Sequence, residues 1–482
     1  MNQSLTLKII PFLDVHLMFP LLEFLEQNEI YPKQQVQLAA FELSKKTKML
    51  DFQKKKQEEL GAISEAGITP IDYQKEEKEI MDQIENYKQV CEPLLTKLKD
   101  YNQNKESIKE SLQVYLSGDN RIKPEMLDKL YDYAKFIYET GDYETAAALL
   151  SDVKQLYGEV NIDKAYMTAW GKLASELMCK EWESASAALN DLRELMENRF
   201  QQMLQHERSS ANAAASSTAP VTTAITKSGV KSVELDLINA RCWFIHWSLF
   251  VAFFDQANGY KVFLDLFFPY PAGTSHPQTD LTSNKYISAL FQSNCSYILR
   301  YLAVIIILKK RNKTYLNGLV KFMEQHLIIR SDFQQQDELL SDPVIQFIYQ
   351  LNVNHDFKAA YDTLMTCENI LKNDYFTASH VKEFMNQGKN MIFESYAKVS
   401  HVFAYGDASK TDFPLDEEFI NSAINSLKIQ ATVDTEHHRV TGKKHLPNIY
   451  QQILERTEES AQKTHNIALN VKNLQAQRQS KH

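Results

Sequence analysis

Residues 241–254 read Arg-Cys-Trp-Phe-Ile-His-Trp-Ser-Leu-Phe-Val-Ala-Phe-Phe and carry no charge after Arg241. Aromatic side chains recur at helical spacing on one side, from Trp243 through Trp247 to Phe254, and apolar residues cover much of the rest. A helix that is apolar on most sides must be enclosed by neighbouring elements. It is shorter than the roughly 20 apolar residues that a bilayer-spanning helix needs. This stretch therefore predicts a buried helix in the middle of the chain, with further helices packed on both sides.

His246 and Ser248 are the strongly polar residues of this stretch. A lone histidine on an aromatic helix is more often a core residue hydrogen-bonded to the backbone than a ligand or a general base. We therefore expect His246 to lie in the core and assign it no metal or cofactor.

The composition is typical of a soluble globular protein. The 482 residues, of which 44% are hydrophobic, can bury a large core and predict roughly two to four domains or one long repeat array. The formal charge of −9 argues against a protein whose whole surface coats nucleic acid. The five cysteines are widely spaced without a CxxC pair, which disfavours a disulfide framework and a zinc site. No secretory signal is visible at the N-terminus, so we expect a reducing, cytoplasmic location.

Three short segments share one pattern: an acidic residue, an aromatic residue, two variable residues and an alanine. They run from Asp142 to Ala146, from Glu181 to Ala185 and from Asp356 to Ala360. A helix is expected before each segment, and the small alanine would let the following helix approach its partner closely. Units that cannot bury an apolar face alone stack as a solenoid. The pattern predicts a TPR/HEAT-like array of antiparallel helix pairs, with chance similarity of three short segments as the alternative.

Two prolines set expected helix boundaries. Pro20 is placed to begin a short helix over residues 19–29, since proline is favoured in the first turn. Apolar side chains recur in steps of three and four over residues 73–115, which is typical of a helical seam. Pro93 interrupts this seam and should break or kink the helix, which predicts two helical segments in place of one straight helix.

Two stretches are expected to interrupt the helices. Residues 207–233 are rich in Ser, Ala and Thr and lack aromatic residues, so they predict a mobile linker or insert. Residues 269–285 are rich in Pro, Thr and Ser and predict an exposed loop.

The periodicity changes in the last hundred residues. Two helical stretches are followed by residues that alternate between apolar and polar from Ile429 to Val433, and a return strand begins at Arg439. Helix, helix and hairpin in this order predict a winged-helix domain over residues 389–445.

The hairpin allows two kinds of contact. Arg439, Lys443 and Lys444 lie in a local basic patch that could touch RNA phosphate. The alternative, which we favour, is that an exposed strand edge pairs with a hairpin of another chain. A steep salt dependence of RNA binding, lost on substitution of Lys443 and Lys444, would support the first.

Residues 446–482 predict a final helix that follows Pro447. Ile467, Val471 and Leu474 recur on roughly one side, while the middle of the helix is almost wholly polar. So few apolar groups cannot fold a helix alone. The helix therefore needs a partner surface, and its last residues should fray.

The sequence carries none of the common catalytic signatures. There is no phosphate loop of the G-x-x-x-x-G-K-[ST] kind, no H-E-x-x-H, no G-x-S-x-G and no G-x-G-x-x-G. His437, His438 and His445 lie near the hairpin, but they offer no fourth ligand, so a metal is disfavoured. We expect no enzyme activity and no cofactor.

The expected fold class is mainly α: a helical-repeat solenoid, then a winged-helix module, then a C-terminal helix. The expected divisions are residues 1–206 for N-terminal helical repeats, 207–233 for the linker or insert, 234–388 for further helical repeats, 389–445 for the winged helix and 446–482 for the C-terminal helix and tail.

Several longer motifs resemble one known family. They are Phe12-Leu-Asp-Val-His-Leu-Met-Phe-Pro-Leu-Leu-Glu-Phe-Leu, Tyr133-Ala-Lys-Phe, Gly141-Asp-Tyr, Trp170-Gly-Lys-Leu-Ala-Ser-Glu, Ile245-His-Trp-Ser-Leu-Phe-Val, Ile298-Leu-Arg-Tyr-Leu and Tyr450-Gln-Gln-Ile. The chain resembles the family of E subunits of eukaryotic translation initiation factor three, a family of PCI-domain proteins. The resemblance implies a non-catalytic helical-repeat array with a winged helix, lodged among other PCI and MPN subunits that bind the small ribosomal subunit.

The resemblance also implies where partners are held. In this family the winged helices contact one another and the C-terminal helices gather in a bundle, which makes Ile429, Val433, Ile467, Val471 and Leu474 candidates for subunit contact. mRNA or rRNA is a further candidate partner, and no membrane is expected. PCI subunits of the proteasome lid and the signalosome share the architecture, so a scaffold of that type is one alternative. A winged-helix RNA-binding protein is the other.

Overall fold

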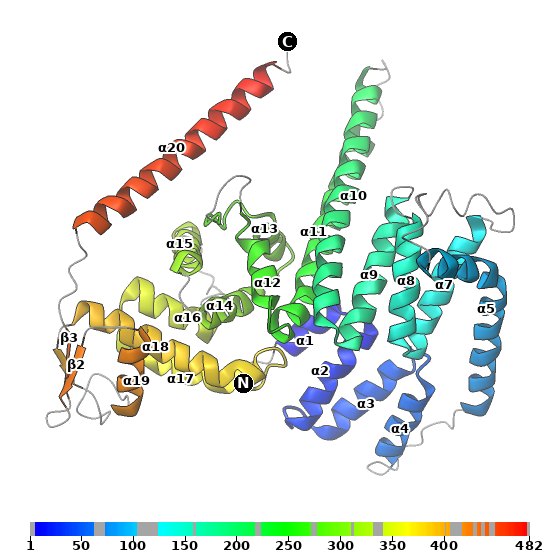
Figure 1. Ribbon diagram of the computed structural model, residues 1–482, viewed down its shortest axis with the longest axis horizontal. Helices are drawn as coiled ribbons and strands as arrows, with labels where there is room; N and C mark the ends of the chain where they lie inside the picture. The colour runs from blue at the N-terminus through cyan, green and yellow to red at the C-terminus, as the bar shows by residue number, and fades with distance from the viewer. Residues whose placement is uncertain are drawn as a thin grey trace. The chain divides into compact units, whose positions relative to one another are not determined.

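The protein is described by a computed structural model that is mainly α-helical, with one three-stranded sheet among the described residues (Figure 1). The described residues are 5–61, 73–103, 124–157, 161–216, 223–270, 277–309, 313–330, 341–400, 402–404, 417–427, 431–434, 439–442 and 449–479. The chain divides into two compact units, Met1–Gly388 and Lys389–His482.

Helices make up the first unit. Its first elements are α1 (Thr6–Ile9), η1 (Ile10–Phe12), α2 (Val15–Gln27), α3 (Lys33–Ser44), α4 (Leu50–Gly61), α5 (Tyr73–Gln103), α7 (Pro124–Thr140), α8 (Tyr143–Tyr157), α9 (Ile162–Cys179), α10 (Trp182–Ser216) and α11 (Thr223–Phe254). It continues with α12 (Gly259–Phe267), α13 (Lys285–Gln292), α14 (Ile298–Leu308), α15 (Lys313–Arg330), α16 (Pro343–Tyr349), η2 (Gln350–Asn354), α17 (Phe357–Lys372), η3 (Ala378–His380) and the start of α18 (Val381–Val399).

The core of this unit is built around α11, as expected. Phe244, Ile245 and Leu249 have no exposed surface. Trp243 is the exception, because 37% of it is exposed. By length and composition Val233–Phe254 could cross a membrane, but 67% of its most apolar window is buried inside the protein. A mostly buried helix of this kind is explained by packing against its neighbours in the core.

The turns before the three repeated segments share one backbone geometry. The residue before the acid has a left-handed conformation in each: Gly141 with φ 94°, Lys180 with φ 61° and His355 with φ 55°. The carbonyl of the acid then accepts the backbone N–H of the alanine four residues later, at 3.1 Å for Asp142 and Ala146, 2.9 Å for Glu181 and Ala185 and 3.0 Å for Asp356 and Ala360. All three alanines are fully buried. The same short pattern thus ends one helix and begins the next in three places.

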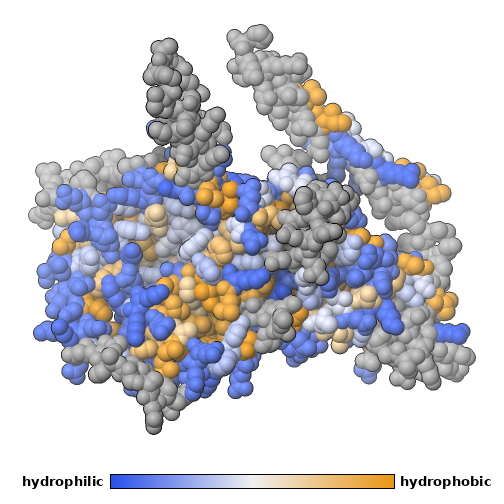
Figure 2. All heavy atoms as spheres, turned by 180° about the vertical axis from the view of Figure 1, so that it is seen from behind, coloured by the Kyte–Doolittle hydropathy of each residue, from blue (hydrophilic) through white to orange (hydrophobic). Residues whose placement is uncertain are grey.

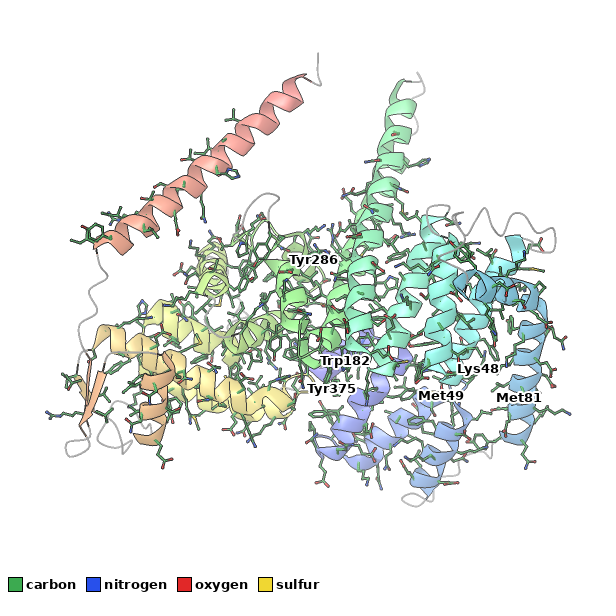
Figure 3. All side chains as sticks on the ribbon, in the orientation of Figure 1. Lys48, Met49, Met81, Trp182, Tyr286 and Tyr375 are labelled. Atoms are coloured by element: carbon green, nitrogen blue, oxygen red, sulfur yellow. The ribbon has the colours of Figure 1, made fainter. Side chains whose placement is uncertain are left out.

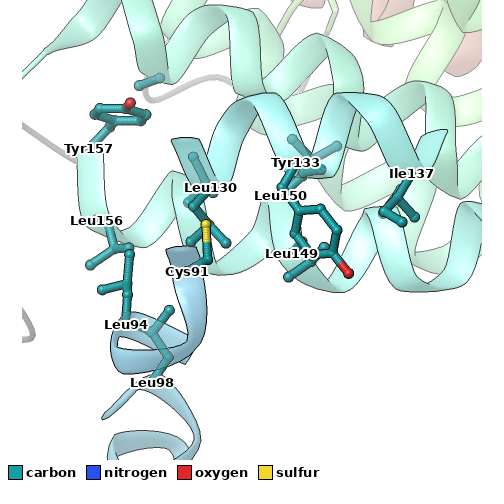
Figure 4. Close-up of a cluster of buried hydrophobic side chains, with 14 of the residues drawn as sticks. Cys91, Leu94, Leu98, Leu130, Tyr133, Ile137, Leu149, Leu150, Leu156 and Tyr157 are labelled. Atoms are coloured by element: carbon teal, nitrogen blue, oxygen red, sulfur yellow. The ribbon is translucent and has the colours of Figure 1, made fainter. Parts of the chain in front are cut away.

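A hydrophobic cluster joins α5, α7 and α8 (Figure 4). Cys91, Leu94 and Leu98 of α5 are buried in it. Pro93 lies inside α5, which continues to Gln103, so the expected break is absent within the described residues, but α5 bends partway along, as expected of a kink (Figure 1). Proline removes only one backbone donor, and the buried side chains on both sides of it hold the helix together.

Pro20 likewise does not begin a helix. α2 starts five residues earlier, at Val15, where the Asp14 carboxylate accepts the backbone N–H of His16 at 3.1 Å. Aspartate is a favoured N-cap, and the cap provides the start signal that was assigned to the proline.

The expected linker at residues 207–233 is also corrected. α10 runs to Ser216 and α11 begins at Thr223, so the segment is helical except for residues 217–222, which lie outside the described residues. Alanine has the highest helix propensity, and both helices extend from packed segments, so they avoid the cost of nucleation. Low complexity was mistaken for the absence of structure.

The expected loop at residues 269–285 lies partly outside the described residues, which resume at 277. Its last part is anchored by Asn284, which is 8% exposed. The amide of Asn284 donates to the carbonyls of Leu266 and Phe267, both at 2.9 Å, and its oxygen caps the start of α13. This end of the loop is therefore packed against α12.

Aromatic contacts link α10 and α11 to the segment between α17 and η3 (Figure 3). The Trp182 ring stacks on Phe254, with centroids 5.4 Å apart. Phe254 lies 5.3 Å from the Tyr375 ring. The C-terminal end of α11 is thus held from both sides.

The second unit contains the rest of α18, β1 (Val402–Ala404), α19 (Glu417–Leu427), β2 (Ala431–Asp434), β3 (Arg439–Gly442) and α20 (Ile449–Gln479). Its sheet is antiparallel with the order β1-β3-β2, so β3 is central. The expected hairpin corresponds to β2 and β3, with Val433 opposite Val440.

Candidate functional site

Exposed large apolar side chains gather on α20 among the described residues. Its exposed apolar side chains include Ile449, Ile453, Ile467 and Val471, which are 71%, 56%, 63% and 47% exposed. At about 100° per residue these four project from one side of the helix. Figure 2 shows hydrophobic residues toward both ends of this helix and hydrophilic residues between them. Leu474 lies in α20, but its side chain lies outside what the structure describes.

Two of the expected site residues lie on the strands of the hairpin. Val433 is half-buried on β2, and Arg439 is exposed on β3. Arg439 lies opposite Asp434 in the strand register. Ile429, Lys443 and Lys444 lie outside the described residues. Periodicity alone could not show which residues lie opposite each other, because this depends on the register of the turn.

Two exposed valines beside the sheet were not predicted from the sequence as contact residues. Val399, near the end of α18, is 70% exposed, and Val402 on β1 is 53% exposed. β1 pairs on one side with β3 and is an edge strand of the sheet. Exposed apolar residues next to a strand edge are typical of a surface that pairs with another chain.

The N-terminal segment is anchored on α11 within the first unit. Trp247 donates its indole N–H to the carbonyl of Phe12 at 2.9 Å. The Phe12 ring stacks on His246 with centroids 4.2 Å apart. The Tyr297 hydroxyl donates to the carbonyl of Lys8 at 2.9 Å. Segments more than 200 residues apart in sequence are joined by these bonds.

His246 is a core residue, as expected. Its Nδ1 lies 2.7 Å from the carbonyl of Cys242, and its Nε2 lies 2.8 Å from the Tyr297 hydroxyl. A carbonyl only accepts, so Nδ1 carries the proton of the neutral ring, and the single proton of the Tyr297 hydroxyl is shared between two acceptors, Nε2 and the Lys8 carbonyl. Burial lowers the pKa of His246 to about 4, although the Cys242 carbonyl raises it. Among the described residues no group of three His, Cys, Asp or Glu side chains is placed to hold a metal.

The buried His246 predicts a pH-dependent stability. Its folded pKa is below the ordinary 6.5, so the unfolded chain binds the proton more tightly, and stability is lost as pH falls from about 6.5 to 4. We expect a loss of about 2 kcal/mol between pH 7 and pH 5 from this group. The measurement is urea unfolding at each pH for the wild type and His246→Gln, which does not titrate. Equal pH dependence in both proteins would contradict the assignment.

A buried ionic network holds α14, α16 and the end of α17 together. Arg300, which is 3% exposed, forms an ion pair with Asp342, the N-cap of α16. The Tyr301 hydroxyl donates to Asp374 at 2.6 Å. Burial raises the pKa of the Asp374 carboxyl, while its bond from Tyr301 and the charge of Arg300 lower it. This network links the three elements in the interior of the unit.

Known proteins are similar to this chain over nearly its whole length. A family model described as the eIF3 subunit 6 N terminal domain matches residues 4–137. The chain is 30% identical to the E subunit of eukaryotic translation initiation factor 3 of Bombyx mori, over 95% of this chain and 92% of the relative. It is 30% identical to the E subunit of Aspergillus terreus, over 93% and 90%. The E subunit of Arabidopsis thaliana is 26% identical, over 97% and 96%. Because the similarity covers nine-tenths or more of each of these proteins and of this chain, the chain belongs to the family of E subunits of eukaryotic translation initiation factor 3.

Proposed function

We propose that this chain is a non-catalytic scaffold subunit of the cytoplasmic initiation factor 3 complex. In this proposal a helical-repeat array, a winged-helix module and the C-terminal helix present surfaces that other PCI and MPN subunits cover. The assembled complex would bind the small ribosomal subunit and support mRNA recruitment. Similarity over nearly the full length to the E subunits of three organisms supports this place in the initiation factor 3 complex.

Two observations support the architecture. The shared turns before α8, α10 and α17 are the feature that a repeat array requires, since each turn places the next helix against the last. The order of α18, β1, α19, β2 and β3, with the sheet order β1-β3-β2, is consistent with a winged helix. We infer that the expected contacts at Ile429 and Val433 belong to this module.

The observation that carries the proposal is the exposed apolar side of α20. Burying an apolar side chain contributes roughly 1.5–3 kcal/mol, so the exposed isoleucines and valine of this helix represent a large unused driving force for association. An isolated helix of this kind is also marginal in water. A partner that covers this side would stabilise the helix and the complex together.

The test is the double substitution Ile467→Glu and Val471→Glu in the affinity-tagged chain. Two charges on the apolar side should prevent burial and reduce the yield of co-purifying initiation-factor subunits by about tenfold or more. Quantitative mass spectrometry of the purified complex gives the yield. The first unit should unfold at the same temperature as in the wild type.

The matched control is Ala461→Glu with Gln462→Glu, which adds the same charges to exposed positions on other sides of α20. This control should retain the other subunits. If the Ile467 and Val471 variant co-purified the other subunits in undiminished yield, the proposal that α20 anchors the chain would be wrong.

A further inference from the structure

Four aromatic rings from distant parts of the first unit form one cluster. They are Phe24 of α2, Trp182 at the start of α10, Phe254 at the end of α11 and Tyr375, which follows α17. The centroids of Trp182 and Phe254 lie 5.4 Å apart, those of Phe254 and Tyr375 5.3 Å apart, and those of Tyr375 and Phe24 5.7 Å apart. Figure 3 shows Trp182 and Tyr375 close together. These separations are those of aromatic rings in contact, so the four rings form a continuous row.

The cluster has an inner side and an outer side. Phe250 and Phe376, which are 3% and 1% exposed, lie against Tyr375 with centroids 6.2 Å and 5.1 Å away. These two rings belong to the core, whereas each of the four rings of the row is only half-buried. Partly exposed aromatic side chains are enriched at protein interfaces, because a large ring gives contact area at a small cost in conformational freedom.

Carboxylates adjoin these rings. They are Glu23 beside Phe24, Glu181 and Glu183 on either side of Trp182, and Asp255 beside Phe254. The three glutamates are exposed and the aspartate is half-buried. Consecutive Cα atoms are only about 3.8 Å apart, so each carboxylate lies near a ring of the row. Three separate helices thus bring negative charge to one aromatic cluster.

The negative charge is not neutralised by ion pairs within the chain. Among the described residues, none of the four carboxylates has a lysine, arginine or histidine within ion-pair distance. Lys180 is exposed next to Glu181, and Lys372 at the end of α17 is paired with Glu368. Burial and the charge of Glu23 raise the pKa of Tyr375 to about 12, so its hydroxyl keeps its proton at neutral pH. The outer side of the cluster therefore favours a positively charged partner.

We propose that the aromatic surface formed by Phe24, Trp182, Phe254 and Tyr375, with the carboxylates beside them, binds an extended, arginine-containing segment of a partner protein. A planar guanidinium can stack on an aromatic ring and pair with a carboxylate at the same time. Lysine matches the charge but lacks the planar group. RNA would be repelled by the carboxylates. This surface lies in the first unit and is distinct from α20 and from the hairpin.

The test measures the fluorescence anisotropy of a labelled peptide as the purified full chain is added. The probe has about twelve residues and consists of Arg-Gly-Gly repeats. A second probe carries lysine in place of each arginine. The arginine probe should bind roughly fivefold or more tightly than the lysine probe, because both carry the same charge and only the guanidinium stacks well on the rings.

Trp182→Leu tests the rings, because it keeps an apolar side chain but removes the aromatic face. It should weaken binding of the arginine probe by roughly five- to thirtyfold and binding of the lysine probe by much less. Trp182→Phe should keep most of the affinity. The matched control is Trp243→Leu, which removes another partly exposed tryptophan of the same unit, roughly 16 Å along α11 from Phe254.

A second variant tests the charges and leaves every ring in place. It combines Glu23→Gln, Glu181→Gln and Glu183→Gln. At about 0.1 M salt the affinity for the arginine probe should fall by about tenfold, and binding should depend less on salt. The matched control combines Glu58→Gln, Glu92→Gln and Glu125→Gln, which are exposed residues of α4, α5 and α7. This control should retain the affinity, and both variants should unfold at the temperature of the wild type.

Three outcomes would overturn the inference. The first is no measurable binding of the arginine probe by the wild type at low salt. The second is equal affinity for the arginine and lysine probes, which would show that the rings do not take part. The third is an equal loss of affinity in the carboxylate variant and its control. The scaffold function is tested separately by co-purification, so a peptide that fails to bind while the other subunits still co-purify would contradict this inference alone.

Discussion

Replacing Arg300 with methionine is expected to lower the free energy of unfolding of the first unit by roughly 3–5 kcal/mol. The substitution leaves the Asp342 carboxylate, which is only 10% exposed, without its ion-pair partner. An unpaired charge in this position loses the attraction but keeps the desolvation cost. Urea unfolding followed by tryptophan fluorescence measures the effect, because all four tryptophans lie in α9, α10 and α11 of this unit.

A double variant separates the ion pair from simple packing. Asp342→Asn removes the charge while it retains an N-cap oxygen for α16. Arg300→Met combined with Asp342→Asn should therefore be more stable than Arg300→Met alone, since no unpaired charge remains. Additive losses in the double variant would mean that the two side chains do not interact.

An exposed pair provides the control. Lys372 and Glu368 on α17 form an ion pair at 2.7 Å, but their side chains are 56% and 34% exposed. Lys372→Met should change the free energy of unfolding by less than about 1 kcal/mol. A loss as large as that of Arg300→Met would show that burial is not what makes the Arg300 pair important.

The sequence was most informative where periodicity and packing act together. The buried helix at residues 241–254, the acid–aromatic–alanine segments and the hairpin pattern each predicted a local structure that is present. In each case the signal is local: apolar side chains at a fixed period, or a short turn that begins a helix. Such signals do not need knowledge of distant partners.

The errors have local causes as well. Pro20 was given more weight than the Asp14 cap, which decides where α2 begins. Residues 207–233 were read as a linker because they lack large apolar groups, although alanine favours a helix. The exposure of Trp243 was missed because helical spacing does not show where a covering element stops.

The contacts between distant segments were the hardest part to predict. Arg300 pairs with Asp342 across 42 positions, and Tyr301 pairs with Asp374 across 73. No period or motif links these residues, so only the folded chain brings them together.

Trp247→Ala should cost on the order of 3–5 kcal/mol, because it removes a large side chain from an enclosed site. Trp247 is 4% exposed, and its ring meets that of Trp170 edge-on with centroids 4.7 Å apart. The substitution also leaves the Phe12 carbonyl without its indole donor, so the N-terminal segment loses one of its bonds to α11. Urea unfolding gives the change, with the remaining three tryptophans as reporters.

Trp243→Ala is the matched control, since Trp243 lies one turn earlier on the same helix and is 37% exposed. The same chemical change there should cost clearly less, about 1–2 kcal/mol, because part of the ring already contacts water. Protease protection of residues 5–14 provides a second readout: it should fall in Trp247→Ala and persist in Trp243→Ala. A loss under about 1 kcal/mol for Trp247→Ala would mean that α11 is not enclosed, which would remove the basis for a core built around this helix.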